Sequence, residues 1–270
     1  MPPEQLDSLA QCWTSAEGQA KSAVLIAAGQ GGIGGALAKD LLQRFSALQV
    51  FATHRSGDHQ APAWAAEYAN RLRWLRVDLT DEPGLQRLHT QLASELEQTG
   101  SRLRLLFNAS GLLHGDRLQP EKSISQLSMA GLQQSFAVNA FAPALLAQAL
   151  WPLMKSSGLC VFGSLSARVG SIGDNRLGGW YSYRAAKAAQ NQLLRCLAIE
   201  WKRSNRQSVC VALHPGTVDT ALSAPFRSGV AAESRFSTQR AATQLLDILL
   251  ALQPADSGRF IAWDGQDVPW

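Results

Sequence analysis

The amino-acid sequence predicts an α/β fold, a single domain in which helices cover both faces of a doubly wound parallel sheet. Strand-length apolar runs alternate with helical patterns along the chain, and this alternation is typical of parallel sheets. At 270 residues the chain is long enough to bury one full core. Residues 22–270 are expected to form this domain, and residues 1–21 precede it as an N-terminal extension.

The expected elements follow one another in a regular order. Short apolar runs predict strands at 23–28, 48–54, 72–77, 103–108, 158–163, 208–213 and 259–263. Longer segments between them predict helices at 32–46, 83–98, 128–155, 180–203 and 236–252. We find no internal repeat and no linker long enough to divide the chain, so one domain is expected.

A glycine cluster, Gly29-Gln30-Gly31-Gly32-Ile33-Gly34, follows the first expected strand and opens the first long helix. Glycine permits a tight turn and lets backbone N–H groups at a helix N-terminus approach a pyrophosphate. This setting predicts a Rossmann-type dinucleotide site. Its expected phosphate-binding residues are Gly29, Gly31, Gly32, Ile33 and Gly34. The alternative is a glycine-rich turn that binds nothing.

The end of the second expected strand indicates which dinucleotide binds. An NAD site places Asp or Glu about twenty residues after the glycine motif, where it reads the ribose. Here the chain has Thr53-His54-Arg55-Ser56, with an arginine and no carboxylate. Because a guanidinium attracts a phosphate, Arg55 predicts NADP(H) as the cofactor.

Tyr183 and Lys187 stand four residues apart in the expected helix 180–203. At this spacing two side chains share one helix face, with Cβ atoms about 5–6 Å apart. A nearby ammonium lowers the pKa of a tyrosine, so Tyr183 is expected to exchange a proton with a carbonyl or alcohol oxygen. Such pairs also occur by chance on helix surfaces, and the glycine motif upstream is what gives this one weight.

Asn139 lies in an expected helix, and Pro143 follows four residues later. Proline has no N–H to bond the carbonyl of Asn139, and its ring pushes that carbonyl away. The carbonyl is therefore expected to be available to another donor, such as a water molecule. A proline-kinked helix with a surface asparagine is the alternative.

Composition argues against several other functions. The net charge is +4, but charged residues make up only 17% of the chain and the basic ones are scattered, so no nucleic-acid surface is expected. No histidines stand at metal-ligand spacing, so no metal site is expected. The four cysteines form no Cys-x-x-Cys pair, which fits a reducing cytoplasm. With no signal peptide and no apolar run of membrane length, no membrane association is expected.

From about residue 22 to its end, the chain resembles the short-chain dehydrogenase/reductase family. Besides the motifs above, the order and spacing of several segments make chance agreement improbable. These segments are Ser166-Ala-Arg-Val-Gly-Ser-Ile172, Gly178-Gly-Trp-Tyr-Ser-Tyr-Arg184, His214-Pro-Gly-Thr-Val-Asp-Thr220 and Ala262-Trp-Asp-Gly265. They are most similar to the branch that contains the C-factor signalling protein and the sniffer-type carbonyl reductases.

The resemblance implies a role for each matching position. Tyr183 is the acid/base group, Lys187 holds the ribose hydroxyls and lowers the tyrosine pKa, and Asn139 supports a water relay. Asp78 meets the adenine amino group. Further cofactor contacts are implied at Asn108, Gly111, Pro215, Gly216, Val218 and Thr220. The family likeness also implies transfer of the pro-S hydride, and a homodimer or homotetramer built through the helices 128–155 and 180–203.

The sequence departs from the family pattern in the glycine loop and on the adenosine side. Ala27 and Ala28 stand where the family has threonine and its first glycine. Ala109 replaces the second asparagine of the adenosine-side motif. The loop conformation is therefore expected to differ in detail.

The most serious departure is Ala167, which occupies the position of the family's catalytic serine. Ser164, Ser166 and Ser171 are the nearby hydroxyls. Our hypothesis is that a twist at the strand end turns Ser166 inward to polarise the substrate carbonyl.

The sequence thus predicts an NADPH-dependent oxidoreductase that reduces a ketone or aldehyde, with Tyr183 as the proton donor. The alternative is a nucleotide-binding signalling or regulatory protein of the same fold with marginal catalysis. Ala167 and the C-factor likeness favour the alternative, whereas Asn139, Tyr183 and Lys187 argue against it.

Overall fold

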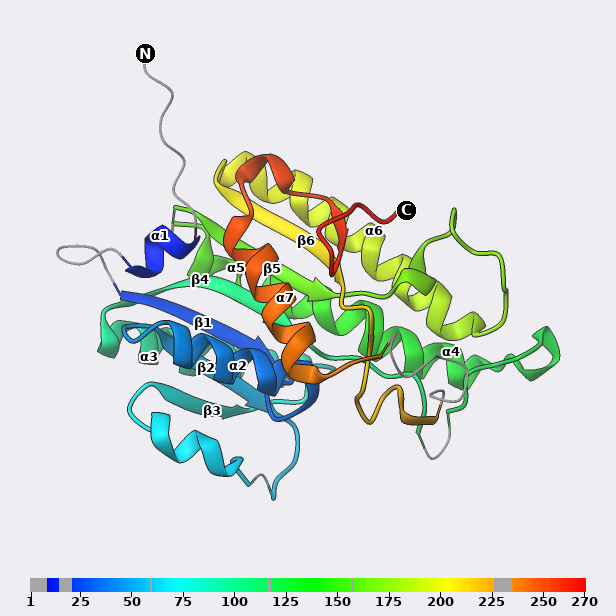
Figure 1. The fold of residues 1–270 in the computed structure, drawn as a ribbon, viewed down its shortest axis with the longest axis horizontal. Coiled ribbons are helices and arrows are strands. Elements are labelled where there is room, and N and C mark those ends of the chain that lie inside the picture. Colours follow the sequence, from blue (N-terminus) through cyan, green and yellow to red (C-terminus); the bar gives the residue numbers. More distant parts are fainter. Residues whose placement is uncertain (1–8, 15–20, 59, 116–117, 157, 226–234) are drawn as a thin grey trace, which may run out of the picture.

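The computed structural model describes residues 9–14, 21–58, 60–115, 118–156, 158–225 and 235–270. Its centre is a seven-stranded parallel sheet in the order β3-β2-β1-β4-β5-β6-β9 (Figure 1). The strands are β1 (Lys21–Ala27), β2 (Gln49–His54), β3 (Leu72–Arg76), β4 (Ser101–Asn108), β5 (Cys160–Leu165), β6 (Ser208–His214) and β9 (Phe260–Ala262). The order reverses between β1 and β4, and in such sheets ligands bind beyond the carboxyl ends of the strands at this point.

Helices cover both faces of the sheet, as the sequence predicted (Figure 1). The helices are α1 (Leu9–Thr14), α2 (Gly32–Arg44), α3 (Glu82–Thr99), α4 (Met129–Phe136), α5 (Ala142–Met154), α6 (Tyr181–Ser204) and α7 (Thr238–Ala251). Side chains alternate across each strand, so Val24 and Ile26 pack in the core with α1, α2 and α7. Leu25 packs in the second core, with α3, α5 and α6.

Three features of the fold were not predicted. A short second sheet pairs β7 (Thr217–Val218) with β8 (Arg235–Phe236). The expected helix 128–155 is interrupted by a π-helical turn, η3 (Ala137–Phe141), between α4 and α5. Within the N-terminal extension, Leu9 and Trp13 of α1 are buried in the core beside α2 and α7.

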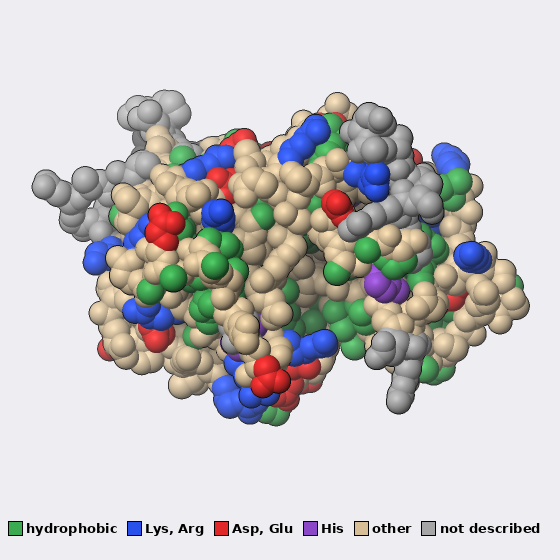
Figure 2. All heavy atoms as spheres, turned by 60° about the horizontal axis from the view of Figure 1, so that its bottom comes forward, with side chains coloured by type: hydrophobic (Ala, Val, Ile, Leu, Met, Phe, Trp, Pro, Cys, Tyr) green, Lys and Arg blue, Asp and Glu red, His purple; other side chains and the backbone are tan. Residues whose placement is uncertain are grey.

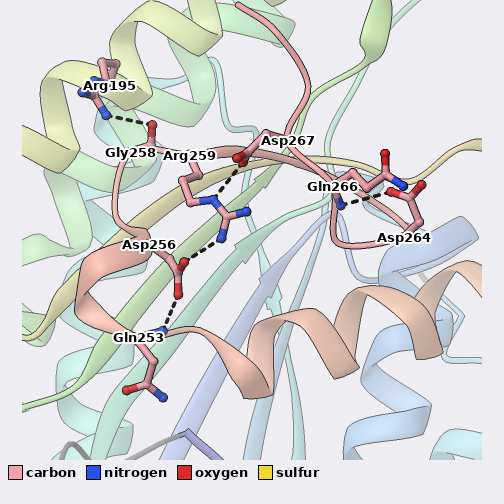
Figure 3. Close-up of polar contacts among 8 residues, drawn as sticks. All are labelled: Arg195, Gln253, Asp256, Gly258, Arg259, Asp264, Gln266 and Asp267. Carbon is pink, nitrogen blue, oxygen red and sulfur yellow. Dashed lines mark hydrogen bonds and ion pairs between the residues drawn. The ribbon is translucent and has the colours of Figure 1, made fainter.

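Polar contacts hold the residues just before and just after the edge strand β9 (Figure 3). Arg259 forms ion pairs with Asp256, at 2.6 Å, and with Asp267, at 2.8 Å. Arg195 of α6 donates to the Gly258 carbonyl at 3.0 Å. Exposed ion pairs add little to stability, so their consequence here is positional: they fix the segment that carries Trp263 toward the sheet edge.

The continuous helical segment Met129–Met154 is long and apolar enough to cross a membrane by length and composition. In this fold its α5 part packs against α3, β4 and α6, whereas Met129 and Phe141 remain exposed. Acidic and basic side chains are interspersed on the face drawn in Figure 2.

Among the described residues, Cys160, Cys196 and Cys210 are unpaired thiols. In the same part of the chain, no cluster of three or more His, Cys, Asp or Glu side chains could hold a metal.

Candidate active site

Tyr183 and Lys187 lie in the first turns of α6, beside the end of β5. Tyr183 is 8% exposed and Lys187 is 2% exposed. The Lys187 Nζ atom lies 5.9 Å from the centre of the Tyr183 ring. Trp180 caps the helix in a left-handed conformation, with φ of 50°, and its ring meets Tyr183 edge to face. The helical spacing therefore brings the two groups together as expected.

Burial dominates the ionisation of both groups. It raises the pKa of Tyr183 and lowers the pKa of Lys187 to about 7. The sequence argument expected the ammonium to lower the tyrosine pKa. In this structure desolvation acts more strongly, and the ammonium donates to Leu165 O and Gln190 Oε1, each at 2.8 Å. Tyr183 consequently stays protonated at neutral pH, which is the form a proton donor requires.

Asn139 is fully buried within the π-helical turn η3. Its side-chain oxygen accepts from Leu112 N at 2.8 Å, and its side-chain nitrogen donates to Leu112 O at 2.7 Å and to Ser135 Oγ at 3.2 Å. The side chain thus fixes the loop after β4. Pro143 cannot donate to the Asn139 carbonyl, and π turns of this kind are frequent at functional sites.

The serines at the end of β5 form hydrogen bonds with side chains of α6. Ser164 and Ser166 share one face of the strand. Ser164 Oγ accepts from Gln190 at 2.7 Å, and Ser166 Oγ donates to Asn191 Oδ1 at 2.7 Å. In this arrangement the proton of Ser166 is engaged by Asn191. Ala167 is extended, so its Cβ points to the opposite side of the chain.

Ser171, the third nearby hydroxyl, is 1% exposed. Its Oγ donates to Trp270 O at 3.3 Å and accepts from Asp174 N at 3.1 Å. The structure therefore gives each of the three serines a partner within the protein.

These contacts lead to a test of which hydroxyl, if any, polarises the substrate carbonyl. We expect Ser166→Ala to change the reduction rate less than about threefold, because its hydroxyl bonds Asn191. Ala167→Ser should raise the rate at least tenfold, since one oxyanion-type donor is worth about 10²–10³ in rate. Steady-state turnover of both variants decides the point. A tenfold loss in Ser166→Ala with no gain in Ala167→Ser would instead support Ser166 as the donor.

The glycine loop keeps a tight turn although its first residue is alanine. Ala28 has a positive φ of 58°, which only glycine adopts without strain. Ala28 N donates to Thr53 Oγ1 at 2.9 Å, and Gly29 N donates to Thr53 O at 2.9 Å. A Cβ on Gly34 would lie 2.6 Å from the Ala28 carbonyl oxygen. The loop is therefore closely packed against the ends of β1 and β2.

The N-terminus of α2 fits a pyrophosphate. Gly31 is its N-cap and supplies no side-chain cap, so the backbone N–H groups of the first turn remain available there. A Cβ on Gly31 would meet no atom within 4 Å, which leaves room for a ligand. Helix N-termini of this kind favour phosphate groups. Gly32 and Ile33 lie in this first turn.

The strained alanine predicts a stabilising substitution. Left-handed backbone costs a non-glycine residue about 1–2 kcal/mol, and the added freedom of an unfolded glycine offsets about 0.4–1 kcal/mol of the gain. Ala28→Gly should therefore raise the free energy of unfolding by about 0.5–1 kcal/mol. Chemical denaturation measures this change. Ala27→Gly, in the buried strand, is the control and should destabilise; a loss of stability in Ala28→Gly would contradict the account.

Arg55 and Asp78 follow the adjacent strands β2 and β3. Both side chains are exposed. Burial raises the pKa of Asp78, but hydrogen bonds from Thr80 and the charge of Arg55 outweigh it and lower the pKa. The guanidinium and the carboxylate therefore lie close enough to interact at the carboxyl edge of the sheet.

The other predicted cofactor residues gather around the same edge. Asn108 is fully buried, and its side chain forms hydrogen bonds with Ser164 and Ser110. Gly111 is exposed beside the Asn139 side chain. A Cβ on Gly32 would lie 3.8 Å from Thr220, which brings the segment after β6 against the glycine loop.

The segment predicted to contact the nicotinamide is braced by neighbouring aromatic residues. Gly216 has a φ of 77°, and a Cβ there would lie 2.7 Å from the Phe236 ring. Phe236 packs edge to face on Trp263, which follows β9. Pro215 is half-buried and Val218 is buried in β7, so the edge strands brace this segment.

The short chain dehydrogenase family model matches residues 22–231. The chain belongs to the short-chain dehydrogenase/reductase family. It is 30% identical to C-signal of Myxococcus xanthus over 148 residues, which is 55% of this chain and 84% of that protein. It is also 30% identical to 1-hydroxy-2-glutathionyl-2-methyl-3-butene dehydrogenase of Rhodococcus sp. over 194 residues, which is 72% of this chain and 78% of that one.

Among solved structures, the fold matches the NADPH-bound carbonyl reductase from chicken fatty liver with a TM-score of 0.80 at 28% identity. The match covers 94% of this chain and 96% of that one. The resemblance inferred from the motifs is confirmed, including the likeness to the C-factor branch. The protein is therefore an oxidoreductase of this family, whose members use NAD(P).

Sequence reasoning missed the buried polar residues that support the site. Gln190 and Asn191 follow Lys187 by three and four positions, so they face the same side of α6. Polar side chains at core positions of a helix were the available signal. Thr53 was noted only as part of the ribose segment, whereas its side chain also fixes the glycine loop.

Proposed function

We propose that the protein reduces a ketone or aldehyde with NADPH. The observation that carries this proposal is the pairing of Tyr183 and Lys187 at the carboxyl end of β5, on the same edge of the sheet as a glycine loop whose helix N-terminus is uncapped and open. The chicken carbonyl reductase, which binds NADPH, supports the same reaction class. The glycine loop would hold the pyrophosphate, Arg55 the 2′-phosphate, and the segment 215–220 the nicotinamide side.

Bound NADPH supplies the hydride, and the chain's own residues handle the proton. Tyr183 donates its hydroxyl proton to the substrate oxygen as negative charge develops there. Lys187, when charged, stabilises the phenolate that remains and bonds the ribose hydroxyls. The Asn139 side chain holds the loop at Leu112, and its backbone carbonyl, to which Pro143 cannot donate, would accept from a relay water.

NADP(H) is preferred in this proposal because the segment after β2 offers Arg55 and no carboxylate within its ribose-reading residues. The free cysteines among the described residues fit a reducing cytoplasm. Exposed apolar side chains on the helices support a homodimer or homotetramer. These side chains are Met129 on α4, Phe141 on η3 and Ile199 on α6.

A regulatory nucleotide-binding protein is the second candidate. Ala167 removes the usual hydroxyl, and C-signal is among the relatives. Two experiments separate the candidates: fluorescence titration with NADPH and NADH, then a panel of ketones and aldehydes followed at the nicotinamide absorbance. Turnover of a panel member with NADPH supports the reductase, whereas tight binding without turnover supports the regulatory protein.

A further inference from the structure

Lys187 depends on protein partners because it is almost completely withdrawn from water. An ammonium in such a place requires hydrogen bonds to offset its lost hydration. Leu165 O and Gln190 Oε1 provide two, both at 2.8 Å. An ammonium has three N–H bonds, so these two contacts leave one N–H for the cofactor ribose. The first partner is a backbone group, and the second is a side chain that substitution can change.

Gln190 is itself held in a single orientation. It is 1% exposed. Its side-chain nitrogen donates to Ser164 Oγ at 2.7 Å and to Leu165 O at 3.1 Å. A flipped carboxamide would turn N–H groups toward the ammonium and place its oxygen against the Leu165 carbonyl, which can only accept. The oxygen is therefore directed at Lys187 by the geometry of β5.

The network continues to the adenosine side of the site. Ser164 Oγ also accepts from Asn108 Nδ2 at 2.9 Å, and Asn108 Oδ1 accepts from Ser110 Oγ at 2.7 Å. A buried chain of hydrogen bonds thus joins Lys187 to the loop after β4. Because every member is buried, the position of the ammonium is tied to the central strands of the sheet.

We propose that Gln190 is a positioning residue of the active site, whose amide oxygen holds the Lys187 ammonium at the end of β5 and stabilises its charged form. The kinetic part of this inference rests on the proposed function, whereas the stabilisation of the charge does not. Gln190 contacts neither substrate nor cofactor in this account. It acts through Lys187.

The protonation equilibrium of Lys187 is close enough to neutral pH that a single amide acceptor changes it. Ionisable side chains on the segments around it include Tyr183 and Arg184 on α6, Arg168 on η4 (Arg168–Gly170), His214 at the end of β6, and the buried Glu121, which accepts from Ser182 in the first turn of α6. Arg168 is paired with Asp174, and Arg184 donates to backbone carbonyls. Burial is the cause that lowers the pKa of Lys187 to about 7. The ammonium is therefore lost as the pH rises through neutrality, and removing an acceptor should move that loss to lower pH.

The direct test labels lysine side chains with ¹³C at Cε and follows their pH titration by NMR in the protein alone. Lys187→Met assigns the Lys187 signal. Gln190→Leu should lower the pKa of Lys187 by about one unit, because a charge-assisted hydrogen bond is lost. Gln190→Glu should raise it by about one unit or more, because a carboxylate then faces the ammonium. Asn191→Leu is the matched control, since it changes the same buried face of α6 without contacting Nζ, and should leave the titration in place.

Kinetics supply the second readout. The fall of kcat for reduction at high pH should move to lower pH in Gln190→Leu and to higher pH in Gln190→Glu. In both variants KM for the carbonyl should change less than kcat. If Gln190→Leu fails to fold, Gln190→Glu alone still decides. A Lys187 titration unmoved by Gln190→Glu would overturn the proposal. A shifted titration in a protein that reduces no carbonyl would keep the positioning role and reject the proposed function.

Discussion

Tyr183→Phe should lower reductase turnover by about 10²–10⁴-fold, the contribution typical of a positioned acid. Only the hydroxyl is lost, so the ring keeps its contact with Trp180. Burial raises the pKa of Tyr183, so the wild-type residue is protonated at neutral pH and able to donate. The affinity for NADPH should be almost unchanged, and fluorescence titration of the variant measures it beside steady-state turnover.

Two neighbouring substitutions control this experiment. Tyr181 lies two residues earlier and is 37% exposed. Tyr181→Phe should leave turnover near the wild-type rate; if this variant were inactive and Tyr183→Phe active, the assignment of the acid would be wrong. Lys187→Met should reduce both turnover and cofactor affinity, because Lys187 is assigned to the ribose and to the phenolate.

Arg55→Ala should weaken NADPH by about 1.5–3 kcal/mol, the value of hydrogen bonds to a charged group. This loss corresponds to roughly a 10- to 150-fold increase in Kd. NADH lacks the 2′-phosphate, so its affinity should hardly change. Parallel titrations with both cofactors, at one fixed salt concentration, measure the difference.

Arg73→Ala is the matched control for Arg55. Arg73 is also an exposed arginine, but it lies inside β3, away from the carboxyl edge. Its removal should affect neither cofactor. Equal losses of NADPH and NADH affinity in Arg55→Ala would show that Arg55 does not select the phosphorylated cofactor.

The fold could be predicted because its signals are local. The central strands β1 and β5, for example, are short apolar runs buried almost throughout, whereas the edge strand β3 alternates between buried and exposed residues. The Tyr183–Lys187 pair was predictable for the same reason, since four residues fix two side chains on one helix face. The glycine cluster likewise carries its own strand–turn–helix context.

What the sequence missed depends on contacts between distant segments. The hydroxyl of Ser166 is engaged by Asn191, and only the packing of α6 on β5 brings them together. The direction of the Tyr183 pKa depends on how deeply the ring is buried, which spacing alone does not determine. The π turn at Asn139 arises where α4 meets α5, and the proline predicted a disturbance there without specifying its form.

The measurement that tests the central claim most directly is isotope transfer. NADPH carrying deuterium at the 4S or the 4R position of the nicotinamide is incubated with the protein and a ketone or aldehyde from the panel, and the alcohol is analysed by mass spectrometry. The account predicts deuterium on the carbinol carbon from the 4S label, none from the 4R label, and almost no product with Tyr183→Phe. A protein that binds NADPH yet yields no labelled alcohol from either form would contradict it.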